Sequence, residues 1–180
     1  IEDGYSINLL PLATFAMDVY GDDDCIPFKP VPTAVPHSEK TTRLITKMQK
    51  AIAVMQFKVE GQIINRNPEY NMQDRNLLER INYENMTIEL GGKLYELSDK
   101  NLPTVDPNNP YQLTEEEASV MRKLKQSFMN SDKMRKHMRW LYAKGSLYLV
   151  RNANLMFHAS MPMNEDGTFK KVLVHGKEYS

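Results

Sequence analysis

The stretch Ser38–Val59, SEKTTRLITKMQKAIAVMQFKV, decides the fold class of this chain. Its apolar residues recur about every 3.6 positions, as one face of an α-helix requires; they are Leu44, Ile45, Met48, Ala51, Ile52, Met55 and Val59. Ser38 is a favourable N-cap, so the pattern predicts a long helix reaching about Phe57 or slightly beyond. The basic residues of the segment lie off this apolar stripe, which predicts a solvated face for Lys40, Arg43, Lys47 and Lys50.

On the N-terminal side, helical spacing predicts a further helix at Ile7–Tyr20, with Asn8 as its cap and Gly21 at its end. The run Asp22–Asp24 is predicted to be a solvated turn, because adjacent side chains diverge and do not converge on a hard cation. Residues 26–36 contain four prolines, which predicts an extended connector before the long helix.

On the C-terminal side, the sequence predicts a short helix at Asp74–Ile81 and a hairpin at 87–97, whose turn at Gly91-Gly92 needs positive φ. Thr114 and Glu117 form the capping box of a helix that runs to about Asn130. Ser131 caps the next helix, which ends at Gly145. The residues predicted to face inward from these two helices are Val120, Met121, Leu124 and Phe128, and then Met134, Met138, Leu141 and Tyr142.

Residues 146–180 predict strands, at Ser146–Val150, Asn154–His158 and Lys171–Val174. The predicted fold class is therefore α+β, with residues 1–145 mostly helical and the strands after them. We expect residues 1–180 to be a single piece of a longer parent, because the chain begins with Ile1 and not with Met.

The composition is that of an ordinary globular protein, with 41% hydrophobic and 26% charged residues. Lys plus Arg equals Asp plus Glu, at 23 each, so net charge favours neither nucleic acid nor a membrane surface as a partner. The sequence has no apolar run of the roughly 18 residues that a membrane span needs. The single cysteine, Cys25, excludes an internal disulfide and indicates a reduced thiol in a cytoplasmic protein.

Among the histidines, His158 has the most suggestive setting, since it ends the apolar run Leu155–Phe157 directly before a loop. Its position alone leaves two readings open, a metal ligand and a satisfied core histidine. His37, His137 and His175 are expected at the surface. The basic stretch Lys133–Lys144, with Trp140 and Tyr142 interleaved, is either a solvated helix face or a polyanion-binding surface.

Long strings of this sequence resemble the class III fructose-1,6-bisphosphatases of bacteria. The stretches that carry the resemblance are IEDGYSINLLPLATFA (1–16), LPTVDP (102–107), RWLYAKG (139–145), KGSLYL (144–149), NLMFH (154–158) and MPMNEDGTFK (161–170). The resemblance implies a calcineurin-like metallophosphoesterase, a four-layer α/β/β/α sandwich in the intact parent, to whose sheet the strands of 146–180 would belong. It also implies a two-metal site, commonly with Mn²⁺, that hydrolyses the 1-phosphate of fructose 1,6-bisphosphate in gluconeogenesis.

Within that resemblance, His158 falls where the family's later lone metal-binding histidine stands. The family's Asp-x-His, Gly-Asp-x-x-Asp, Gly-Asn-His-Asp and terminal Gly-His motifs do not occur here, so we expect the isolated chain to be inactive. Arg139 and Lys144 are candidates to meet a phosphate, with a structural role equally open. The expected partners are fructose 1,6-bisphosphate and further copies of the chain. The alternative function is a non-enzymatic helical binding or oligomerisation module that uses the basic face at 133–144.

Overall fold

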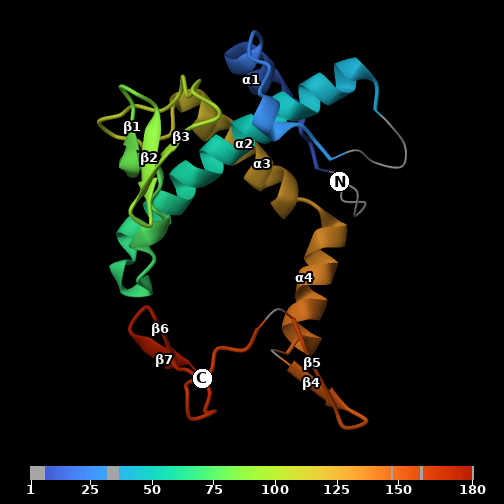
Figure 1. Ribbon diagram of the computed structural model, residues 1–180. Helices are drawn as coiled ribbons and strands as arrows, with labels where there is room; N and C mark the ends of the chain where they lie inside the picture. The colour runs from blue at the N-terminus through green and yellow to red at the C-terminus, as the bar shows by residue number, and fades with distance from the viewer. Residues whose placement is uncertain (1–6, 32–36, 147, 159, 180) are drawn as a thin grey trace.

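The computed structural model describes residues 7–31, 37–146, 148–158 and 160–179, and these form four α-helices and three small antiparallel sheets (Figure 1). The fold class is therefore α+β, as predicted. Residues 32–36 of the predicted proline-rich connector lie outside the described residues, and its first part contains a 3₁₀ turn at Ile26–Phe28. In the described part of the chain, no helix has both the length and the apolar character needed to cross a membrane.

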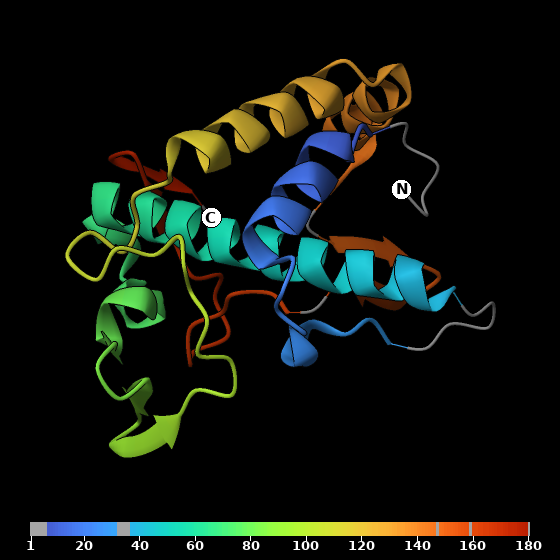
Figure 2. The same cartoon turned by 90° about the horizontal axis from the view of Figure 1, so that it is seen from above.

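Helix α2 (Glu39–Arg66) is the long central element, and α1 (Leu10–Tyr20) and α3 (Glu115–Met129) pack beside it (Figure 2). Ser38 caps α2 as predicted, accepting a hydrogen bond from the Thr41 N–H. The main core lies where the three helices meet, and its buried members are Leu12, Phe15, Ala16, Tyr20, Cys25, Ala51, Met55, Val120 and Leu124. Burial of these side chains provides the main favourable term in folding of the helical part.

The buried face of α2 differs from the prediction. Of the predicted apolar stripe, Ala51 and Met55 are fully buried, whereas Leu44, Ile45, Met48, Ile52 and Val59 are only partly buried. The helix is turned so that Lys47, Lys50 and Lys58 enter the interior instead. The predicted solvated face is therefore wrong for Lys47 and Lys50, because each ammonium group finds oxygen partners in the interior that replace its water.

The region after α2 holds a three-stranded antiparallel sheet in the order β1 (Ile81–Asn82), β2 (Thr87–Leu90), β3 (Lys93–Glu96). The predicted turn at Gly91-Gly92 is present, with φ of 58° and 74°. The predicted short helix at 74–81 is wrong, since two 3₁₀ turns, Gln73–Arg75 and Leu78–Arg80, take its place. Asn76 ends the first turn with a non-helical backbone (φ −74°, ψ 77°), and its buried side chain donates a 2.7 Å hydrogen bond to Asn65 Oδ1.

Helix α3 begins with the predicted capping box between Thr114 and Glu117, and Ser131 caps α4 (Asp132–Lys144). Phe128, predicted to face inward, is 43% exposed. Every residue of α4 is exposed or half-buried, so the predicted inward stripe of this helix is not covered by the described residues. The prediction was wrong because periodicity identifies an apolar face but not whether a neighbour packs against it.

Two separate hairpins follow α4. Strands β4 (Tyr148–Arg151) and β5 (Asn154–Phe157) form one, and β6 (Val172–Val174) and β7 (Lys177–Tyr179) form the other. Strand β7 was missed because its sequence, Lys-Glu-Tyr, has no apolar alternation, whereas positive φ at His175 and Gly176 makes the hairpin turn. Within the described residues the two hairpins are not hydrogen-bonded to each other.

Candidate functional site

His158 directly follows β5 and is exposed, so its predicted place at the end of a strand and the start of a loop is correct. The reading of His158 as a buried core histidine is wrong for this structure. Among the described residues, no group of three or more His, Cys, Asp and Glu side chains could hold a metal ion. The donors among the described residues therefore offer His158 as the candidate ligand and do not by themselves fit the binuclear centre that the resemblance implies.

The two predicted phosphate-binding candidates, Arg139 and Lys144, are exposed residues of α4. Helix α4 also leaves Trp140 63% exposed and Tyr142 87% exposed. The basic and aromatic side chains of the 133–144 face are thus available at the surface, although this alone assigns them no ligand.

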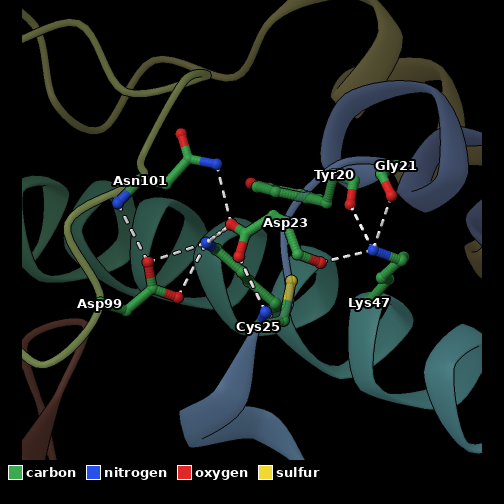
Figure 3. A network of polar contacts seen from close by, with 8 residues as sticks. Tyr20, Gly21, Asp23, Cys25, Lys47, Asp99 and Asn101 are labelled. Carbon is green, nitrogen blue, oxygen red and sulfur yellow. Dashed lines mark hydrogen bonds and ion pairs between the residues drawn. The ribbon is translucent and has the colours of Figure 1, made fainter.

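The most elaborate polar arrangement lies instead at the side of α2 (Figure 3). Lys47 donates to three backbone carbonyl oxygens at the end of α1, at 2.6 Å to Tyr20, 3.0 Å to Gly21 and 2.5 Å to Asp23. A helix C-terminus leaves unsatisfied carbonyls and carries partial negative charge, so an ammonium group there is doubly favourable. Lys47 therefore satisfies carbonyl groups that the end of α1 leaves without helical partners, and attaches this end of α1 to α2.

One turn along α2, Lys50 is completely buried and joins two loops. Its Nζ lies 2.5 Å from Asp23 Oδ2 and 2.7 Å from Asp99 Oδ2, and 4.9 Å from the centre of the Tyr20 ring. Asn101 completes the arrangement, donating from its side chain to Asp23 at 2.8 Å and from its backbone to Asp99 at 3.0 Å (Figure 3). Lys50 thus links the loop after α1 and the loop after β3 through one buried charge.

These contacts set the protonation of the groups around Lys50. Burial alone would raise the pKa of Asp23, but hydrogen bonds from Lys50, the Cys25 N–H and Asn101 lower it to about 2. Burial raises the pKa of the Tyr20 hydroxyl to about 12 and that of the Cys25 thiol to about 11. At neutral pH the cluster therefore combines ionised Asp23 with a neutral phenol and a neutral thiol.

A second buried lysine, Lys58, connects α2 to α3. Its Nζ lies 2.7 Å from Glu117 Oε2 and 2.5 Å from the Thr104 carbonyl oxygen, and both charged side chains are essentially inaccessible. Glu117 makes a second contact, because the same Oε2 accepts a 2.9 Å hydrogen bond from the Thr114 N–H of the capping box. One carboxylate oxygen thus fixes the start of α3 and holds it against α2.

The chemistry of these clusters is structural. An open cleft of about 390 Å³ lies beside the Lys50 cluster, and Asp23, Cys25 and Asp99 contribute to its wall. The ammonium groups of Lys50 and Lys58 are nevertheless directed at protein oxygens, so they hold loops and helices together and are not left to bind a ligand. The prediction that Asp22–Asp24 is merely a solvated turn is wrong for Asp23.

Sequence reasoning missed both clusters, although one signal was present. Lys47, Lys50, Lys58 and Gly61 share a single face of α2 when placed at 100° per residue, together with the small apolar residues Ala51 and Val54. Lysines on a face of small residues leave room for chain segments whose oxygens can surround the ammonium groups. Nothing in the sequence next to Asp23, Asp99 and Glu117 indicates that their carboxylates pair with these lysines.

The chain belongs to the family of Firmicute fructose-1,6-bisphosphatases, whose family model matches residues 1–180. It is 57% identical over 175 residues to a class 3 fructose-1,6-bisphosphatase from Alkaliphilus metalliredigens, covering 97% of this chain and 26% of that protein. It is 54% identical to the class 3 enzyme of Clostridium novyi and 55% identical to that of Bacteroides thetaiotaomicron, covering 100% and 99% of this chain and 27% of each relative. The chain thus spans about a quarter of the length of these relatives. No solved structure matches it.

Proposed function

We propose that the chain contributes a helical scaffold and a pair of hairpins to a fructose-1,6-bisphosphatase. That enzyme, a phosphoric monoester hydrolase, removes the 1-phosphate of fructose 1,6-bisphosphate, a reaction of gluconeogenesis. The observation that carries the proposal is the match of the family over all of residues 1–180, with more than half of the residues identical to curated class 3 enzymes. An enzyme of central carbohydrate metabolism acts in the cytoplasm, which is the location we propose.

His158 is the residue of this chain that we propose as a metal ligand in a family-length protein. Its exposed position at the end of β5 leaves the imidazole accessible to groups contributed by other parts of the polypeptide. The remaining ligands of a two-metal Mn²⁺ site in a calcineurin-like sandwich would come from outside residues 1–180. A divalent metal at such a site supplies charge stabilisation to the transferring phosphoryl group.

Phosphate release from fructose 1,6-bisphosphate with added Mn²⁺ tests the activity. We expect release by a family-length protein that contains this sequence and none by the 180-residue chain alone. Turnover by the 180-residue chain would contradict the proposed division of the metal ligands.

The role of His158 is tested separately in the family-length protein. His158→Ala should lower both bound metal, measured by elemental analysis, and turnover, whereas His37→Ala, at another exposed histidine, should change neither. Unchanged metal content in the His158 variant would remove this residue from the site. Assembly of several copies stays a prediction, which sedimentation of the family-length protein would test.

The second candidate function is a binding or oligomerisation module that uses the basic face at 133–144. It is favoured by the exposure of Trp140 and Tyr142 beside the lysines and arginines of α4. Binding to a polyanion with steep salt dependence, lost on changing Arg135 and Lys136 to alanine, would support it. Binding that survives both changes would argue against this face as the module.

A further inference from the structure

The flank formed by α4 and the β4–β5 hairpin has the character of an interior surface. On α4, Met138 is 44% and Leu141 is 51% exposed. On the hairpin, Tyr148 pairs with Phe157 and Leu149 pairs with Met156, and all four side chains are between 43% and 54% exposed. Directly paired residues point to the same side of a hairpin and neighbouring pairs to opposite sides, so both faces of this hairpin carry apolar side chains.

A hairpin of this kind does not suit a water-exposed position. Strands that are apolar on both faces are typical of the inside of a sheet that is covered on both sides. An isolated two-stranded hairpin is at best marginally stable in water. Within the described residues, β4 and β5 pair only with each other, which leaves the outer edge of each strand open to a further strand.

The chain as a whole exposes more surface than a compact protein of its mass. The chain exposes 13620 Å², whereas a compact protein of 20.8 kDa exposes about 9,000 Å². The excess of roughly 4,600 Å² is several times the ~800 Å² per partner that a standard protein–protein interface buries. An interface of standard size with one further copy would cover only a fraction of this whole-chain excess, which is what a piece of a larger folded body would show.

We propose that the flank of α4 and β4–β5 is an intramolecular docking surface, covered by the rest of the polypeptide in a family-length protein. The relatives provide that polypeptide, since this chain spans only 26–27% of their length. The inference rests on the length of the family's proteins and not on the proposed phosphatase activity. The flank is then buried in the family-length protein, and strands from elsewhere in the same polypeptide pair with the open edge of β4 or β5.

Methionine oxidation tests this without any substitution, because peroxide converts accessible methionine to the sulfoxide. Met138 and Met156 report on the flank, at 44% and 46% exposed, and Met17 on α1 is the matched control at 46%. Met55, at 0%, is the buried reference. Oxidation of each residue is followed by mass spectrometry in the 180-residue chain and in the family-length protein.

We expect oxidation of Met138 and Met156 to be at least tenfold slower in the family-length protein, with Met17 unchanged and Met55 slow in both. Equal rates in the two proteins would overturn the proposal, and so would equal protection of Met17, which would show no preference for this flank. If oxidation of Met156 slows as the concentration of the 180-residue chain rises, a second copy covers the flank and the assignment falls. An inactive family-length protein that still protects Met156 would support the docking surface while counting against the proposed function.

Discussion

The buried pair between Lys58 and Glu117 provides the sharpest test of how the helical part is held together. Lys58→Met keeps most of the side-chain volume but leaves the Glu117 carboxylate, 1% exposed, without its ammonium partner. Removing one member of a buried ion pair typically costs about 3–5 kcal/mol, because the remaining charge stays desolvated. This is a large share of the roughly 5–15 kcal/mol by which domains are stable.

The double variant separates the cost of an orphaned charge from the loss of packing. Glu117→Gln retains an oxygen that can accept the Thr114 N–H of the capping box, so the helix start survives. Because Lys58→Met/Glu117→Gln contains no unpaired buried charge, it should be more stable than Lys58→Met alone by about 2 kcal/mol or more. Recovery of folding in the double variant would remain measurable even if Lys58→Met does not fold.

Urea unfolding followed by far-ultraviolet circular dichroism gives the free energies. The matched control is Lys100→Met, which breaks the solvent-exposed pair between Lys100 and Glu96 and should change the free energy of unfolding little, because water screens that pair. The reasoning is refuted if Lys58→Met is no more destabilising than the control, or if the effects of the two buried substitutions simply add.

Three further predictions concern the same helical part. Gly61→Ala should lower the free energy of unfolding by about 1–3 kcal/mol, since the added methyl group would lie 2.2 Å from the Tyr111 ring. A gain of stability, which alanine usually brings when it replaces a glycine within a helix, would contradict this contact. The pKa of Asp23 is lowered from 3.8 to about 2 in the folded state, so its contribution to the free energy of unfolding is present above pH 4 and lost as the pH falls through 2. Acid unfolding of the wild type and of Asp23→Asn checks this. The same loss of stability with falling pH in both proteins would contradict it. The pKa of Tyr20 is raised by burial from 10.0 to about 12, so its contribution to the free energy of unfolding is present below pH 10 and lost as the pH rises to 12. In Tyr20→Phe, alkaline unfolding should show a smaller loss of stability over this range. An unchanged loss of stability between pH 10 and 12 would contradict the shift.

Local signals in the sequence were sufficient for most helix starts and for the first hairpin. Ser38, the Thr114–Glu117 capping box and Ser131 all cap helices in the structure, because an N-cap depends on a few neighbouring residues. The turn at Gly91-Gly92 was equally predictable, since positive φ at two successive positions selects glycine.

The orientation of α2 was not predictable from periodicity, because the partners of its lysines are distant in sequence. Lys50 pairs with Asp99, 49 positions away, and Lys58 pairs with Glu117, 59 positions away. A hydrophobic pattern counts a lysine as polar and assigns it to the solvent, whereas an ammonium group with converging oxygens can be buried. The same reasoning explains Asp23, whose role depends on Lys50 and not on its acidic neighbours.

The two parts of the chain obtain their order in different ways. From α1 to α3, a core of buried apolar side chains is joined by buried lysines of α2 that hold the loop after α1, the loop after β3 and the start of α3. From α4 onward, apolar faces at Leu141, Leu149 and Met156 remain half-exposed, and hydrogen bonds within each hairpin and the stacked rings of Tyr148 and Phe169 contribute to the order. Local opening is easiest where few apolar contacts are buried. The candidate metal ligand His158 lies in this second part, directly after β5. Docking of the flank, as proposed above, would fix the strand that carries the imidazole, so metal binding and docking should be energetically coupled.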